Sequence, residues 1–294
     1  MCWNSNKKIE VLFQKVAKEV YNNKKRAEGK NTEVVTDFNA LMSEIPSLSP
    51  VLCEDQYFGI VNFEKNSSCG WVITPVYLHS KKLDAKENEK PELQANRRQN
   101  AKRIEQANVL KTIVIVLESP HTDEFINGKK GYTAIGPACG TTGENLYKWL
   151  PEVLMNYVPC EVDFENATAT YNEDEAICSG EYKVKLINAI QSQCSLGVDT
   201  DEYRNLVFNR MWNEDIVKAS FHERLQCANP NIIINCCTKG DGIKERNQEL
   251  RYIVQKELNA KFGKSDCLLL RATHPSSYHF KNGLALVDGD EEQI

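Results

Sequence analysis

Four apolar runs, separated by segments with helical spacing, constrain the fold of this chain more than any other feature. The clearest is IVIVL (113–117), which ends abruptly in ESPH (118–121). Runs of β-branched and aliphatic residues that stop at a turn signal predict strands buried on both faces, as in a parallel sheet. The other runs lie at 183–190, 231–237 and 267–273. Because helical segments alternate with these strands, the sequence predicts an α/β fold with right-handed crossovers and helices on both faces of the sheet.

The first third of the chain has a different pattern. Apolar residues recur at helical spacing over 7–27, and a second helix is expected over 32–45, before Pro46. Residues 56–79 alternate and carry turn signals, which predicts a hairpin or short extended pieces. The densely charged segment 80–103 predicts a solvated helix face.

We therefore divide the chain into two parts. Residues 1–105 are expected to form a mostly helical accessory layer, and residues 106–294 an α/β domain. Within that domain, the acidic and polar stretch near 160–182 predicts a surface insertion. Helices are expected near 143–157, over 199–226 and over 243–261.

Composition excludes several classes of protein. The formal net charge of −5 argues against a protein that coats nucleic acid, but it is compatible with an enzyme that grips a few phosphates. No window approaches the roughly 20 apolar residues of a membrane span. The first ten residues lack the apolar region of a signal peptide, so we expect a cytoplasmic protein that does not enter a membrane. The 11 cysteines contain no CxxC pair, so we expect free thiols and neither a metal nor another cofactor.

Polar residues follow three of the apolar runs where the strands should end. Glu118 follows the first run, Asn188 ends the second, and His274 follows the last. In open α/β sheets, ligands bind outside the carboxyl ends of the strands, so these three side chains should converge on one pocket. Gly136 and Gly140 are expected to line the same pocket, where a missing side chain permits close backbone approach.

Each of these residues also has a purely structural interpretation. Glu118 could cap a following helix, and His274 before a proline could be a hydrogen-bonded turn residue. Asn188 at a strand end could form a turn or a cap. The functional interpretation of Glu118 and His274 therefore depends on their facing each other.

Four fragments, taken in chain order, resemble motifs of the uracil-DNA glycosylase superfamily. They are LESPH (117–121), AIGPACG (134–140), LINAI (186–190) and THPSS (273–277). Four such fragments in order are a stronger signal than any one of them. The resemblance implies a three-layer α/β/α sandwich around a central four-stranded parallel sheet. It also implies DNA as the partner and a monofunctional DNA glycosylase, which flips out a pyrimidine and hydrolyses its N-glycosidic bond.

Breaking that bond leaves a cation-like sugar and negative charge on the departing base. The resemblance assigns stabilisation of the sugar, or positioning of the attacking water, to Glu118. His274 would stabilise the leaving base, an electrostatic effect that is usually large. Asn188 can both donate and accept hydrogen bonds, which suits the Watson–Crick edge of a flipped base.

The resemblance assigns further residues to the site. One group would lie under the flipped base: Ala134, Ile135 and Gly136. A second group would contact DNA: Ser276, Ser277 and Tyr278. The two serines would bind flanking phosphates, and the tyrosine would either fill the gap in the duplex or only pack. A third group would support the site or activate water: Ser119 and His121.

Departures from the family pattern bear on the substrate. Ala134 stands where many members carry an aromatic residue that stacks on the base, which leaves room for a larger base. Ser119 stands where several branches carry Asp or Asn, so Glu118 is the available carboxylate. By resemblance, we expect excision of a bulky modified cytosine, hydroxymethylated or glucosylated, from phage DNA in antiviral defence. The alternatives are repair of ordinary uracil, a non-catalytic nucleic-acid-binding module on the same fold, and a hydrolase of nucleosides or nucleotides.

Overall fold

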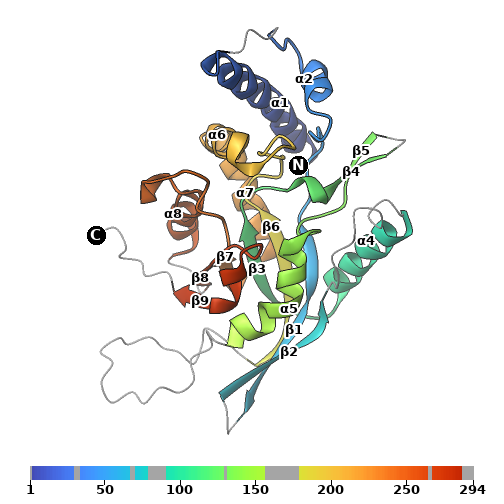
Figure 1. Cartoon of the computed structure of the whole chain (residues 1–294). Coiled ribbons are helices and arrows are strands. Elements are labelled where there is room, and N and C mark those ends of the chain that lie inside the picture. The colour runs from blue at the N-terminus through green and yellow to red at the C-terminus, as the bar shows by residue number, and fades with distance from the viewer. Residues whose placement is uncertain are drawn as a thin grey trace.

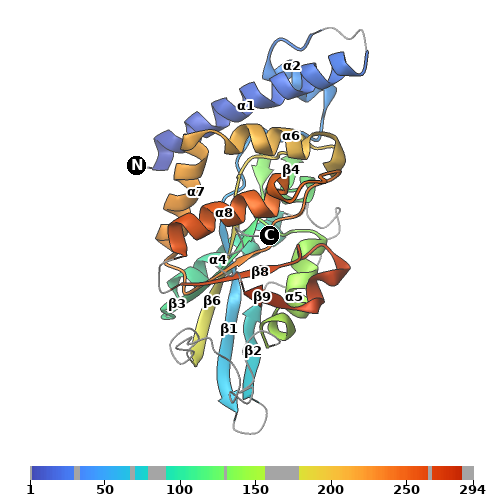
Figure 2. The same cartoon turned by 90° about the vertical axis from the view of Figure 1, so that its left-hand side faces the viewer.

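A mixed sheet of seven strands runs through the molecule, in the order β2-β1-β6-β3-β7-β8-β9 (Figure 1). This computed structural model describes the following residues: 2–29, 34–66, 70–78, 91–128, 131–155, 179–263 and 267–286. Helices cover both faces of the sheet, as Figure 2 shows from the side. The α/β class predicted from the alternation of strands and helices is therefore confirmed.

The centre of the sheet consists of the four apolar runs. They form β6 (Gly180–Asn188), β3 (Lys111–Leu117), β7 (Ile232–Asn235) and β8 (Leu268–Ala272). Neighbouring strands in this group are parallel. Six of the seven residues of β3 are buried, as expected for a strand covered on both faces.

The prediction of a four-stranded parallel sheet is wrong for the sheet as a whole. The alternating segment forms a hairpin of β1 (Gln56–Asn66) and β2 (Gly70–Leu78), and β1 pairs antiparallel with β6. At the opposite edge, β9 (Leu284–Leu286) pairs antiparallel with β8. The added strands satisfy backbone groups that β6 and β8 would otherwise leave unpaired. The predicted boundary near residue 105 thus lies between β2 and β3, which are strands of the same sheet.

Alternate residues of each central strand point to opposite faces and enter two separate cores. On β3, Val114 and Val116 join one core, and Ile113 and Ile115 join the other. The first core is covered by α1 (Cys2–Ala27), α6 (Thr200–Trp212), α7 (Asp215–Ala228) and α8 (Leu250–Phe262). The second is covered by α5 (Thr141–Met155).

Smaller elements complete the fold. Two are helices, α2 (Phe38–Glu44) and α4 (Pro91–Gln106), and two form the hairpin of β4 (Phe125–Gly128) and β5 (Gly131–Ala134). Among the described residues there are also short 3₁₀ turns: η1 (Thr122–Glu124), η3 (Arg246–Gln248) and η4 (Tyr278–Asn282). The expected helical stretch 199–226 is two helices, because the chain turns at Asn213 and Glu214. Most of the expected insertion near 160–182 lies outside the described residues. In the part of the chain that the structure describes, no helix has the length and apolar character needed to cross a membrane.

Strand order determines where a ligand can enter. Among the parallel strands, the chain starts at β3, adds β6 on one side, and then crosses over to add β7 and β8 on the other side. This reversal opens a crevice between the carboxyl ends of β3 and β7, the place where open α/β sheets bind ligands.

Candidate active site

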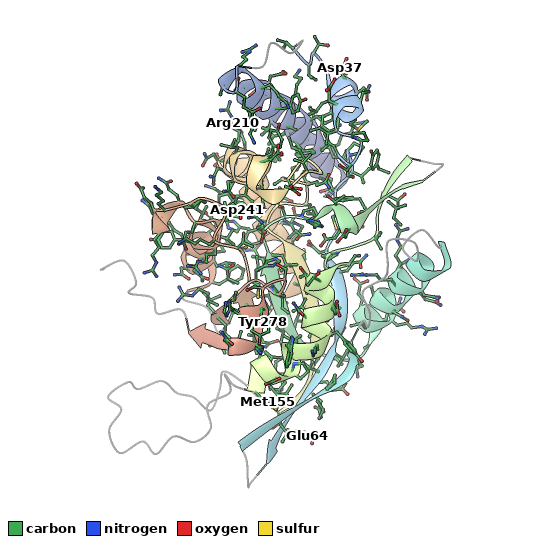
Figure 3. The ribbon with its side chains drawn as sticks, viewed as in Figure 1. Asp37, Glu64, Met155, Arg210, Asp241 and Tyr278 are labelled. Carbon is green, nitrogen blue, oxygen red and sulfur yellow. The ribbon has the colours of Figure 1, made fainter. Side chains whose placement is uncertain are left out.

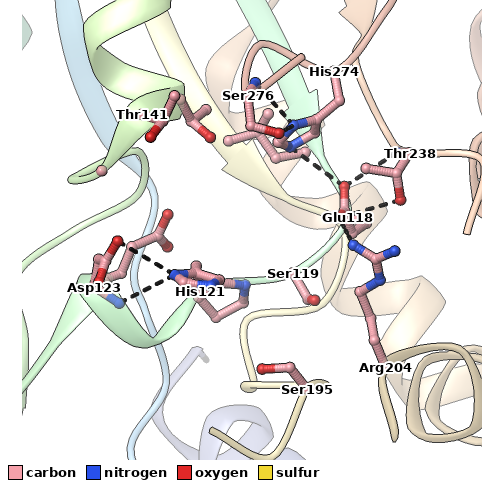
Figure 4. A pocket seen from close by; sticks show the side chains of 15 residues that line it. Glu118, Ser119, His121, Asp123, Thr141, Ser195, Arg204, Thr238, His274 and Ser276 are labelled. Carbon is pink, nitrogen blue, oxygen red and sulfur yellow. Dashed lines mark hydrogen bonds and ion pairs between the residues drawn. The ribbon is translucent and has the colours of Figure 1, made fainter. Parts of the chain in front are cut away.

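A cavity of about 250 Å³ lies at the carboxyl ends of β3, β7 and β8 (Figure 4). Its walls also include η1, the first turn of α5 and one side chain of α6. None of the described residues that line it is aromatic like Phe, Tyr or Trp, and most are polar. They are Leu117, Glu118, Ser119, Pro120, His121, Asp123, Glu124, Gly140, Thr141, Thr142, Ser195, Arg204, Thr238, His274 and Ser276.

Glu118 is the first residue after β3, and it stands in the crevice where the strand order reverses. It is 4% exposed. Its Oε1 accepts hydrogen bonds from Arg204 Nη1 at 3.2 Å and from Thr238 Oγ1 at 3.3 Å. Its Oε2 accepts from the Thr238 backbone N–H at 3.2 Å and lies 3.6 Å from His274 Nε2. A buried carboxyl group that accepts from a guanidinium and two further donors is fixed in position.

Arg204 connects Glu118 to the loop after β7. The side chain projects from α6 and is 10% exposed, and its guanidinium also pairs with Asp241. Its Nε is buried and has no hydrogen-bond partner among the described residues. One arginine thus lies between the carboxyl groups of Glu118 and Asp241.

His274 has a defined tautomer. Its Nδ1 accepts the backbone N–H of Ser276 at 3.1 Å and lies 2.7 Å from Ser276 Oγ. A backbone N–H can only donate, so the proton of the neutral ring is on Nε2. Asn145 of α5 holds this turn by donating to the Pro275 carbonyl at 2.6 Å. His274 therefore presents an N–H donor on the side facing Glu118 and the cavity (Figure 4).

Burial lowers the pKa of His274, and the positive charges of Arg204 and His121 lower it further, while Glu118 opposes them. The ring is therefore neutral near pH 7. A neutral imidazole that donates from Nε2 can stabilise developing negative charge without first losing a proton.

On the facing wall, His121 and Asp123 form a second pair. Asp123 Oδ2 lies 3.5 Å from His121 Nδ1, and the Asp123 backbone N–H donates to the same nitrogen at 3.4 Å. The hydrogen bond with Asp123 raises the pKa of His121. Both side chains are 55% exposed, so this pair forms the rim of the cavity.

Glu124, one residue further along, is buried against the loop that follows β5. Its Oε1 accepts the Ala138 backbone N–H at 2.7 Å, and its Oε2 lies 3.6 Å from Cys53 Sγ. Burial raises the pKa of Glu124 to about 7. Arg97 of α4 holds the other side of this loop, where it donates to Cys139 Sγ at 2.8 Å and to the Pro137 carbonyl.

Asn188 lies beside the cavity and not in its wall. It ends β6 directly opposite Leu117 of β3, one residue before Glu118. The side chain is 1% exposed, and neither amide atom has a partner among the described residues. A buried amide without partners is costly, and no contact among the described residues compensates for this cost.

The structure separates the remaining predicted residues into two groups. Ser119, His121 and Ser276 line the cavity, as does Gly140. The residues that do not line it among those described are Ala134, Ile135, Gly136, Ser277 and Tyr278. Ile135 is buried, Gly136 packs on the side chain of Gln56, and Tyr278 is 76% exposed on η4. Residues 134–136, the stretch expected under a flipped base, therefore lie outside the cavity wall.

Several lining residues escaped the sequence analysis. Thr238 follows β7, so the rule that selected Glu118 and His274 also applies to it and could have found it. Arg204 and Ser195 come from a helix and from the long buried segment after β6, and no local signal marks them. Thr141 and Thr142 open α5 directly after the glycine-rich loop. Searches of family models, curated proteins and solved structures found nothing that matches this chain.

Proposed function

We propose that the chain is a monofunctional DNA glycosylase that flips a modified pyrimidine into the cavity and hydrolyses its N-glycosidic bond. The observation that supports this most strongly is the pairing of His274 with Glu118. The cavity holds a neutral N–H donor 3.6 Å from a fixed carboxylate, contributed by strands far apart in the sequence. This is the combination that the departure of an anionic base from a cation-like sugar requires.

The roles follow from the contacts. When the bond between C1′ and the base nitrogen breaks, its electron pair goes to the base. His274 Nε2–H donates to a base oxygen and stabilises that charge, with Ser276 holding the ring in place. The Glu118 carboxylate, fixed by Arg204 and Thr238, supplies negative potential to the sugar side. Asn188, predicted to bind the edge of the base, is buried beside the cavity and does not line it, so the contacts assign it no role in this scheme.

The proposed fold is that of the glycosylase superfamily, a three-layer sandwich built on β6, β3, β7 and β8 and extended at both edges. Two features support it. The two buried cores lie on opposite faces of the four parallel strands. The motif-like fragments of the sequence also follow β3, end β6 and follow β8, at one edge of the sheet.

The substrate we propose is a hydroxymethylated or glucosylated cytosine of phage DNA, which makes antiviral defence the biological role. The cavity, of about 250 Å³, lies near the lower end of the size range of small-ligand pockets. Its wall is rich in hydroxyl groups, which can hydrogen-bond a hydroxylated substituent: Ser119, Thr141, Thr142, Ser195, Thr238 and Ser276. A bulky substituent can extend over the exposed rim at His121.

The experiment compares three DNA duplexes that differ in one base: uracil, 5-hydroxymethylcytosine and its glucosylated form. Abasic sites are measured after incubation with the protein. We expect abasic sites in the modified duplexes and few in the uracil duplex. Activity on the uracil duplex alone would indicate uracil repair in place of antiviral defence. No activity on any duplex would contradict the glycosylase proposal.

A further inference from the structure

Helix α4 contains a stretch whose charge is opposite to that of the chain as a whole. Residues 93–104 include four cationic side chains and no acidic one, in a chain whose formal net charge is −5. The two acidic residues of the helix, Glu92 and Glu105, lie outside this stretch, near its two ends. Positive charge gathered on one helix is typical of a surface that binds nucleic acid, but it also fits the solvated face predicted from the sequence. The positions of the side chains distinguish the two.

The cations of α4 divide between two sides of the helix. Ile104 is buried and marks the side that packs beside β1. Arg97 lies seven residues earlier, so it shares this side, and it is partly buried. The other three cations, Arg98, Lys102 and Arg103, are exposed, and we call them the outer cations. Among the described residues, no hydrogen bond or ion pair engages the side chain of Lys102 or Arg103, so both are available to a partner.

Hydrogen bonds fix α4 to the loop that enters the cavity wall. Arg97 donates to Cys139 Sγ at 2.8 Å, and the next residue of that loop, Gly140, lines the cavity. Arg98 donates from Nη2 to the Ala134 carbonyl at 2.9 Å. The first half of α4 therefore lies beside the cavity wall, next to the β4–β5 hairpin (Figure 1). The outer cations begin at this point and continue along the exposed side of the helix.

We propose that the outer cations bind phosphates of the DNA duplex next to the flipped nucleotide. This inference rests on the proposed glycosylase function and names a surface that holds its DNA. A duplex carries one negative charge per roughly 3.4 Å of each strand. Arg98 and Lys102 are neighbours on one flank of α4, about 6 Å apart along the helix axis. That separation corresponds to roughly two phosphates of one strand.

A duplex that places one nucleotide in the cavity extends on both sides of it. In Figure 3, Tyr278 of η4 and helix α4 lie on either side of α5, whose first turn lines the cavity. The resemblance assigned DNA contacts only to the side of η4, and the outer cations supply a contact on the other side. Phosphate contacts position a protein on DNA but carry no sequence information. The outer cations should therefore raise the affinity for any duplex and leave the choice of base to the cavity.

The experiment uses duplex DNA without any modified base, so that binding is measured apart from excision. Affinity is determined by fluorescence anisotropy between 50 and 200 mM salt, for the parent and for the double variant Lys102→Gln/Arg103→Gln. Because neither side chain has a partner among the described residues, their replacement should leave the fold intact. The slope of log affinity against log salt should decrease by about 2, and the affinity at 100 mM salt should fall roughly 10- to 10²-fold.

Two further variants separate a phosphate contact from a general effect of net charge. Lys102→Arg/Arg103→Lys keeps both charges and should keep the slope of the parent. Lys256→Gln/Lys261→Gln removes the same charge from exposed positions of α8, which covers the first core, and should also bind DNA like the parent. Excision from the modified duplex should require a higher concentration of Lys102→Gln/Arg103→Gln than of the parent, by the same factor as the loss of affinity.

A slope and an affinity equal to those of the parent in Lys102→Gln/Arg103→Gln would overturn the proposal, as would an equal loss in the α8 variant. Displacement of the duplex by poly-glutamate at the same concentration of charge would also overturn it, because the surface would then fit an acidic protein. If the parent binds the duplex through the outer cations but excises no base, the glycosylase proposal fails and this surface stands. If the parent excises the base and the double variant binds DNA equally well, only this surface is refuted.

Discussion

Glu118 and Glu124 are six residues apart, line the same cavity and are almost equally buried, at 4% and 5% exposure. Their partners differ. Glu118 contacts a guanidinium and the backbone N–H and hydroxyl of Thr238. Glu124 contacts one backbone N–H and a thiol, and Arg97, which influences it electrostatically, bonds Cys139 and Pro137 instead.

The difference teaches that burial alone does not set the charge of a carboxyl group. Glu124, without a cation in contact, has its pKa raised to about 7 by burial. Glu118, with Arg204 at 3.2 Å, has a partner that compensates the cost of burying its charge. One glutamate is thus held by an arginine, and the other anchors the loop around Ala138.

The surroundings of the two cavity histidines shift their pKa values in opposite directions. His274, mostly buried, has its pKa lowered by burial, and His121 at the rim has its pKa raised by Asp123. Environment therefore separates the pKa values of two like residues that line one cavity. The predictions below test this separation.

The largest effect is expected for the donor. His274→Ala should lower the single-turnover excision rate by roughly 10²–10³, as found for the removal of one donor to developing negative charge. DNA affinity should change little, because the interaction strengthens only in the transition state. A variant with the parent's rate would show that the donor is elsewhere.

Glu124 should give the molecule a dependence of stability on pH. Below pH 4.5 both the folded and the unfolded chain hold its proton, and between pH 4.5 and about 7 only the folded chain does. The free energy of unfolding should therefore fall as pH rises, by about 3 kcal/mol in total, and the loss should be complete above pH 7. Denaturation of the parent and of Glu124→Gln at several pH values measures this contribution as the difference between them.

Glu152→Gln, an exposed change on α5, is the matched control and should preserve the pH dependence of the parent. If Glu124→Gln and the parent lose stability in parallel between pH 4.5 and 7, Glu124 is ionised in the folded protein and the comparison with Glu118 is wrong.

Glu118→Gln should lower excision by roughly 10²-fold while leaving DNA binding intact, because it removes the charge and keeps the shape. Glu124→Gln should change the rate at pH 7 only a few-fold, since that group is already half protonated there. Comparing the two variants in one assay distinguishes a carboxyl group that acts on the substrate, Glu118, from one that only anchors a loop, Glu124. Equal losses in both would contradict this distinction.

The smallest effect is expected for Tyr278. The side chain is exposed on η4, outside the cavity, with Lys281 Nζ 4.0 Å from its ring centroid. If it fills the gap left by a flipped base, Tyr278→Ala should slow excision a few-fold in duplex DNA and not in single strands. A change of equal size on both substrates would assign the residue to packing.

Much of this arrangement could be predicted from the sequence, because it depends on local patterns. Apolar runs predicted the four central strands, and the rule of carboxyl strand ends predicted that Glu118 and His274 meet. The edge strands were harder to place, since pairing of β1 with β6 joins segments more than a hundred residues apart. Arg204 could not be predicted, because a single arginine on a helix carries no local sign of its distant partner.

The stretch after β5 shows a second limit of sequence reasoning. Ala134 was expected to lie under the base, but its carbonyl accepts a hydrogen bond from Arg98, and it does not line the cavity among the described residues. The helix α4 that supplies Arg97 and Arg98 was assigned only a solvated face from its charge pattern. The position of this loop depends on tertiary contacts that spacing does not encode. The argument for a modified base therefore rests on the hydroxyl-rich wall.

The most direct test of the account is release of the free base. A duplex carrying one glucosylated 5-hydroxymethylcytosine is mixed with excess protein, and free base and abasic sites are quantified by mass spectrometry. The parent should release the intact modified base in an amount equal to the abasic sites formed, and His274→Ala should release it roughly 10²–10³ times more slowly. An intact duplex after prolonged incubation with the parent, or equal release by both proteins, would contradict the assignment of this cavity.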